Sequence, residues 1–154
     1  MAGERKIISM SVNVGQRNVP DTPQNRCLNA CNAAMKLAMH TIKLCNNKNV
    51  FLPEYQSALT DKIIGTATEI YTDSYGANNI YVNNDADQYR ERKRLQNSSI
   101  NKCYQLLGLI QMAKRLFHLR SNKVKYWSKL TINARDLLKR WRDSDSERYG
   151  KLLS

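Results

Sequence analysis

The residues best placed to do chemistry in this sequence are lysines and arginines, and they are concentrated in one stretch. Residues 90–142 hold fifteen Lys and Arg against two acids, a net charge of +13, whereas the whole chain carries +12. The other residues are therefore close to neutral as a set. A surface that serves only solubility mixes its signs, whereas a one-sided excess of positive charge indicates a polyanionic partner such as nucleic acid or an anionic membrane.

These cations, one lysine excepted, form the candidate nucleic-acid-binding set. They lie near the start of the third expected helix, around the expected turn into the fourth, and along the fourth. The set is Arg90, Arg92, Lys93, Arg94, Lys114, Arg115, Arg120, Lys123, Lys125, Lys129, Arg135, Lys139, Arg140 and Arg142. Phosphate contacts from such side chains depend on salt and are blind to base sequence. The tyrosines among or near them could stack on unpaired bases; they are Tyr89, Tyr104, Tyr126 and Tyr149.

The thiols and imidazoles give a weaker signal. Cys27 and Cys31 lie one helical turn apart and His40 follows nine residues later, but this spacing matches no common zinc motif. Cys45 shares the inward side of the same expected helix, and Cys103 lies inward on another. This placement favours buried free thiols in a reducing compartment. We therefore predict no metal site and no cofactor.

No catalytic arrangement is visible in the sequence. It contains no Gly-rich phosphate loop, no nucleophile elbow and no paired His-Glu helix motif. Asp61, Glu69 and Asp73 recur at spacings of eight and four, but they have no histidine partner and no inward placement, which is typical of a solvated face. The sequence predicts that the protein is not an enzyme.

Four amphipathic segments must position these side chains. Apolar residues recur at steps of three and four over 24–46, 53–80, 86–119 and 124–141, a spacing typical of helices packed nearly parallel to their neighbours. Short polar connections join the segments. We therefore expect an all-α protein, an antiparallel up-down-up-down four-helix bundle with an N-terminal arm. The predicted division is an arm over 1–22, a four-helix bundle over 23–147 and a C-terminal tail over 148–154.

The ends of the bundle and its oligomeric state follow from the same pattern. The first turns of the third helix, residues 89–94, are polar and are expected to project past the bundle end, and the chain after Trp141 is expected to fray. Trp127 and Trp141 lie on the apolar seam and are predicted to anchor the core or a subunit interface. Leu130 and Leu137 widen this seam and are candidates for a subunit contact, so an oligomer is at least as well favoured as a monomer.

The fourth segment resembles a known family. Residues 125–130 (KYWSKL) and 137–144 (LLKRWRDS) resemble the C-terminal helix of a bacterial four-helix-bundle family. This family includes the accessory variability determinant of diversity-generating retroelements and the proteins encoded in ribosomal RNA intervening sequences. The stretches 59–64 (LTDKII), 77–79 (ANN) and 106–110 (LLGLI) are also similar to that family. The resemblance covers most of the chain from the first helix onward and leaves out the arm.

The resemblance implies a homopentamer with a basic surface and no catalytic centre, which binds RNA or DNA. In the retroelement branch it also implies association with a reverse transcriptase during mutagenic copying of a template RNA into cDNA. The alternative is a non-enzymatic oligomeric scaffold whose basic face binds an acidic protein partner, or a relative that binds ribosomal RNA.

The sequence also bears on location. No stretch approaches the roughly 18 apolar residues of a membrane span, and residues 1–25 have no apolar core typical of a signal peptide. Binding to a membrane surface is disfavoured because the apolar stripes are needed for the core. We therefore expect a cytoplasmic protein that does not contact a membrane.

Overall fold

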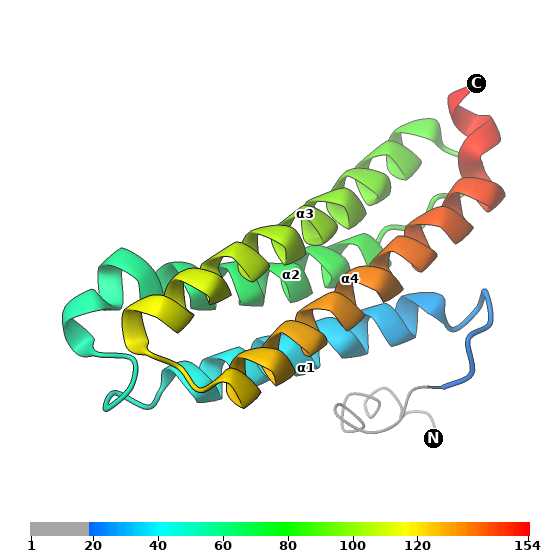
Figure 1. Ribbon diagram of the computed structural model, residues 1–154. Coiled ribbons are helices and arrows are strands. Elements are labelled where there is room, and N and C mark those ends of the chain that lie inside the picture. Colours follow the sequence, from blue (N-terminus) through cyan, green and yellow to red (C-terminus); the bar gives the residue numbers. More distant parts are fainter. Residues whose placement is uncertain (1–18) are drawn as a thin grey trace, which may run out of the picture.

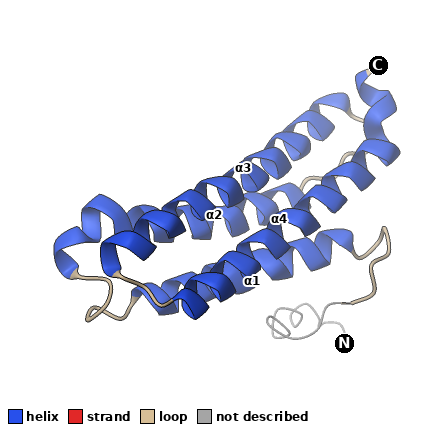
Figure 2. Cartoon of the chain, in the orientation of Figure 1, coloured by secondary structure: helices blue, strands red, loops and turns tan. Residues whose placement is uncertain are grey.

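The computed structural model describes residues 19–154, and these form four long helices joined by short connections (Figure 1). The helices are α1 (Arg26–Cys45), α2 (Asp61–Asn78), α3 (Ala86–Phe117) and α4 (Ser121–Tyr149). A 3-10 turn at Pro53–Tyr55 and one turn of π-helix at Gln56–Thr60 precede α2, and a 3-10 turn at Gly150–Leu153 follows α4. The described part of the chain contains no strand (Figure 2). The expectation of an all-α fold is therefore confirmed.

The four helices pack around one apolar core. Helix α1 packs against α2 and α4, and α3 packs against the same two helices. The two tryptophans, Trp127 and Trp141, are among the largest fully buried side chains and anchor α4 in this core. The Trp127 indole N–H donates to the Thr41 hydroxyl at 2.9 Å, so a polar group that would be costly to bury alone is satisfied between α1 and α4. The prediction of four helices packed against each other is confirmed.

The turn between α3 and α4 is set by two backbone features. His118 ends α3 in the left-handed conformation, with φ of 54° and ψ of 49°, and the Leu119 N–H bonds back to the Lys114 carbonyl at 3.1 Å. A left-handed residue at this position is a common way to end a helix. Leu119 is buried, which ties the turn to the core. The basic residues on both sides of this turn are therefore held near one another.

The start of α3 differs from the sequence expectation. Asp85 caps this helix by accepting a hydrogen bond from the Asp87 N–H at 2.9 Å. Residues 89–94 do not project past the bundle, because α4 continues beyond Trp141 through Tyr149 and packs against one side of them, while Arg90, Glu91 and Arg94 stay exposed. Tyr89 is buried, and its ring centroid lies 5.6 Å from that of Tyr149. The expectation that α4 frays after Trp141 was wrong.

Two further expectations need correction. Leu130 and Leu137 are buried in the core of the single chain, so they are not available as a subunit contact. Their positions beside the seam are covered because α4 lies between two neighbouring helices, α1 and α3. The second segment is not one continuous helix from residue 53, since its first two turns are 3-10 and π-helical. Most of the expected N-terminal arm lies outside the described residues.

Three of the four thiols are buried as expected. Burial raises the pKa of Cys31, Cys45 and Cys103 to about 12 in each case. Cys27 is only half-buried, and its pKa is raised by the same cause. All four are free cysteines. Protonated thiols of this kind behave as small apolar side chains rather than as nucleophiles or metal ligands.

Candidate nucleic-acid interface

The candidate cations fall into three groups in the structure. We name them the start cluster, on the first turns of α3, the turn cluster, on both sides of the α3–α4 turn, and the face cluster, along the second half of α4. The start cluster is Arg90, Arg92, Lys93 and Arg94; the turn cluster is Lys114, Arg115, Arg120, Lys123, Lys125 and Lys129; the face cluster is Arg135, Lys139, Arg140 and Arg142. The three groups differ in how many of their charges are already neutralised.

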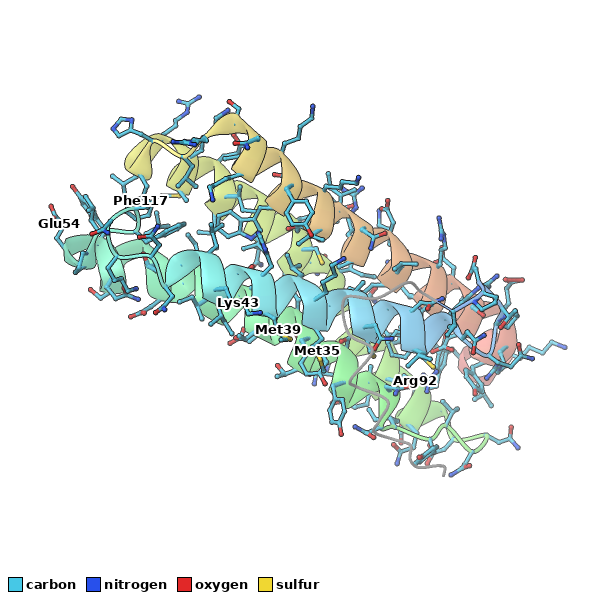
Figure 3. The ribbon with its side chains drawn as sticks, turned by 90° about the horizontal axis from the view of Figure 1, so that it is seen from below. Met35, Met39, Lys43, Glu54, Arg92 and Phe117 are labelled. Atoms are coloured by element: carbon cyan, nitrogen blue, oxygen red, sulfur yellow. The ribbon has the colours of Figure 1, made fainter. Side chains whose placement is uncertain are left out.

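Arg92 of the start cluster is a structural residue. Its Nε lies 2.6 Å from Asp145 Oδ2 and its Nη2 lies 3.0 Å from Asp145 Oδ1, while Nη1 donates to the Ile80 carbonyl at 3.1 Å. The arginine side chain is only 11% exposed and the aspartate only 4%. Gln96 adds a hydrogen bond to Asp145 at 2.7 Å. Figure 3 shows Arg92 at the end of the bundle, where this network joins α3 to α4.

The remaining start-cluster arginines are paired with acids on their own helix. Arg90 lies 2.7 Å from Asp87, and Arg94 makes two hydrogen bonds to Glu91 at 2.8 and 2.7 Å. The hydrogen bond from Arg94 lowers the pKa of Glu91, so this carboxylate stays charged and keeps neutralising the arginine. The start cluster therefore offers a phosphate much less positive charge than its four cations suggest.

Within residues 19–154 the turn cluster has no such neutralisation. None of its six side chains makes an ion pair with another residue of 19–154. Five of them are exposed and Lys114 is half-buried. The sequence contains no acid between Glu91 and Asp136, so none of the residues adjoining this turn can supply one. These cations remain available to an external anion.

Helix α1 extends the turn cluster. His40 on α1 meets Tyr126 on α4 edge to face, with ring centroids 5.1 Å apart. Its pKa is lowered, first by burial and then by the charges of Lys123, Lys36 and Lys43. Lysines from two helices therefore converge on one region. Lys36 and Lys43 were not in the set derived from the sequence, although their spacing of seven, with His40 between them, places all three on one side of a helix.

The face cluster is partly paired and lies beside an exposed tyrosine. Arg135 contacts Asp136 at 3.0 Å, and Arg142 contacts both Asp143 and Asn97 at 3.2 Å. Lys139 donates to the Tyr104 hydroxyl at 2.7 Å. Arg140 is exposed. This cluster therefore combines guanidinium groups held in place by neighbours with an aromatic ring on the adjacent helix.

Lys102 was the one lysine of residues 90–142 left outside the candidate set, and it is occupied. Its ammonium lies 2.8 Å from Asp73 and 3.4 Å from Glu69. Two of the acids spaced along α2 are thus partners of a lysine. In residues 19–154 no three His, Cys, Asp or Glu side chains are grouped so that they could hold a metal ion. None of the helices in this part of the chain has the length and hydropathy needed to cross a membrane.

The comparisons with known proteins add no relative. No family model matches the sequence, and no curated protein or solved structure is significantly similar to it.

Proposed function

We propose that this chain is a non-enzymatic nucleic-acid-binding protein whose main contact surface is the turn cluster. The observation that carries the proposal is the absence of any acid partner for six cations within the described residues. Exposed Lys and Arg side chains without partners bind phosphates with release of the condensed counterions, which makes the affinity strongly dependent on salt. Such contacts recognise the backbone of RNA or DNA rather than the bases.

The proposal includes an antiparallel arrangement of the four helices. Arg92 near the start of α3 pairs with Asp145 near the end of α4, and the Cys31 thiol near the start of α1 lies 3.7 Å from the Ser74 carbonyl near the end of α2. Each contact joins the beginning of one helix to the end of its neighbour. We infer an up-down-up-down bundle, in which the α3–α4 turn lies at one end (Figure 1).

We further propose that the protein is a cytoplasmic homo-oligomer, a pentamer by resemblance, that assists the reverse transcriptase of a diversity-generating retroelement. The support for the retroelement role is the resemblance of α4, whose two tryptophans are core anchors. The support for an oligomer is a set of exposed apolar side chains along one side of α1, namely Leu28, Met39 and Ile42. With Leu130 and Leu137 buried, this side of α1 is the better candidate for a subunit contact.

Binding to nucleic acid is tested by fluorescence anisotropy with protein stripped of nucleic acid at high salt. An RNA hairpin and a DNA duplex are each titrated at several salt concentrations, beginning near 0.05 M. We expect affinity for both, falling steeply as salt rises. No binding at the lowest salt would overturn the proposal and favour a scaffold that binds an acidic protein partner.

The oligomer and its partner are tested separately. Light scattering is expected to give a mass about five times that of the 17.8 kDa chain, and a mass of one chain would contradict the oligomer. A reverse transcriptase encoded beside this gene is expected to be retained by the immobilised protein after nuclease treatment. Its loss after that treatment would mean that nucleic acid, rather than a protein contact, joined the two.

A further inference from the structure

An exposed tyrosine on α3 is held by two cations from α4. The Lys139 ammonium lies 2.7 Å from the Tyr104 hydroxyl and 5.3 Å from the centre of the ring. These two distances together place the ammonium beyond the hydroxyl and close to the plane of the ring, so that it does not cover a ring face. The Arg135 guanidinium also lies 5.3 Å from the ring centre. The tyrosine is nevertheless 46% exposed, so much of its aromatic surface remains open.

The ring is fixed in position by its neighbours. Lys139 binds the hydroxyl, which limits rotation of the ring, and its donated hydrogen bond together with its charge lowers the pKa of Tyr104. Arg135 is itself held by Asp136, which accepts from both its Nε and its Nη2 at 3.0 Å. An aromatic side chain that is already oriented loses little conformational entropy when a ligand stacks on it.

Polar and cationic side chains continue along α3 and α4 on the side of Tyr104. On α3, Asn97 and Asn101 precede Tyr104 at spacings of seven and three, so they share its side of the helix. On α4, Arg142 lies one turn after Lys139, donates to Asn97 of α3 at 3.2 Å and is paired with Asp143 at 3.2 Å. The line from Tyr104 to Asn97 covers about 10 Å along the helix axis. A ring that can stack on a base and a cation that can bind a phosphate therefore lie side by side on this surface.

We propose that Tyr104 is a stacking platform for an unpaired base, and that Lys139, which has no carboxylate partner among residues 19–154, binds the phosphate beside that base. The ligand is single-stranded RNA or DNA, because a base inside a duplex has both faces covered by its neighbours and cannot lie on the ring. Proteins that hold single strands combine aromatic rings with a positively charged groove in this way. The inference rests on the proposed nucleic-acid function and adds to it a place and a preference for unpaired segments.

The test compares three variants in anisotropy titrations against an oligouridylate, an oligothymidylate and a duplex of equal length. Tyr104→Leu removes the aromatic face and keeps the bulk. Tyr104→Phe keeps the face and removes only the hydroxyl. Tyr75→Leu is the matched control, since Tyr75 is also an exposed tyrosine on a helix, α2, and no cation of residues 19–154 lies over its ring. Thermal unfolding of each variant checks that the fold is retained.

We expect Tyr104→Leu to weaken binding to the single strands about tenfold while the duplex affinity and the salt slope stay nearly unchanged. Tyr104→Phe keeps the ring but loses the hydrogen bond to Lys139, so its loss is expected to be much smaller than that of Tyr104→Leu, and Tyr75→Leu is expected to bind like the wild type. Equal loss for single strands and duplex, or no loss at all, would overturn the platform and leave the proposed function in place. Failure of the wild type to bind any of the three ligands would overturn the proposed function itself.

Discussion

The start cluster and the turn cluster are both rich in lysine and arginine, but they differ in how their charges are paired. Both place several Lys and Arg within a few helical turns, at opposite ends of α3. In the start cluster, Arg92 is buried with Asp145, and Arg90 and Arg94 are paired with acids one turn away. In the turn cluster, no cation has an acid partner among residues 19–154.

A count of cations therefore overstates the positive charge that a surface presents to a ligand. A paired surface arginine contributes little field at a distance, because its partner cancels most of it and salt screens the rest. An unpaired one attracts phosphates over a Debye length. The turn cluster is therefore the better candidate for the proposed polyanion contact, whereas the pairs of the start cluster stabilise the bundle.

The largest effect is expected from breaking the buried ion pair. Replacing Asp145 by alanine leaves the Arg92 guanidinium buried without a counter-charge, which costs about 3–5 kcal/mol in the free energy of unfolding. Urea denaturation followed by circular dichroism measures this loss. The double variant Arg92→Met with Asp145→Leu removes both charges, so we expect it to recover part of the lost stability, the remainder being the cost of leaving the buried Gln96 amide without its acceptor.

The matched control for that prediction is the exposed pair at the same end of the helix. Arg90 and Asp87 are also an arginine and an aspartate, but their side chains are 59% and 89% exposed. Asp87→Ala is therefore expected to change the unfolding free energy by about 0.5 kcal/mol or less. A loss as large as that of Asp145→Ala would mean that burial is not what separates the two pairs.

The second largest effect is expected on nucleic-acid affinity. Arg115→Gln with Lys123→Gln removes two unpaired cations, and Arg90→Gln with Arg94→Gln removes two paired ones, so both variants lose the same net charge. We expect the first to reduce the salt slope of binding by about two and the affinity at least tenfold. The second is expected to change the affinity by less than about threefold, because its cations were already neutralised.

Anisotropy titrations at four or more salt concentrations, with one DNA duplex and one RNA hairpin, measure both quantities. Unchanged unfolding midpoints would show that the affinity losses are not losses of fold. If the two double variants lost equal affinity, net charge alone would govern binding and the distinction between the clusters would have no functional meaning.

The fold was predictable because the period of the apolar residues is regular. The spacing of Val124, Trp127, Ala134, Leu138 and Trp141 placed each of them on the seam, and all five are buried. This rule follows from helix geometry and needs no knowledge of the neighbours. The same rule failed after Trp141, because the sequence there is polar. Asp145, the buried acid of that stretch, forms an ion pair with Arg92, which lies far from it along the chain.

The candidate site was less predictable for the same reason. Whether the Arg92 side chain faces solvent or Asp145 depends on where α4 ends. No local pattern in the sequence predicts that end. The partners of Arg90 and Arg94, by contrast, lie three residues away and could have been read from the spacing alone. The contribution of α1 was missed because Lys36 and Lys43 lie outside the stretch with the largest excess of charge.

The smallest effect is expected on the protonation of His40, whose pKa reports the electrostatic potential near the turn cluster. Burial lowers the pKa of His40, and the charges of Lys123, Lys36 and Lys43 lower it further. The neutral imidazole is therefore favoured in the folded chain, whereas the unfolded chain takes up a proton near the ordinary value of about 6.5. Its contribution to stability is present above that pH and is lost as the pH falls toward the folded-state pKa. His40→Gln is expected to make stability depend less on pH in this window.

The charge on Lys123 sharpens this prediction. Lys123→Ala removes a positive charge that opposes protonation, so it should raise the pKa of His40, measured by NMR titration of the imidazole signal that disappears in His40→Gln. Lys62→Ala, which removes an exposed lysine on α2, should leave that pKa unchanged. Bound nucleic acid should raise it as well, since phosphates among these lysines offset their charge. A His40 pKa that responds to Lys123→Ala but not to nucleic acid would place the phosphates elsewhere on the surface, away from the side of the turn cluster that faces α1.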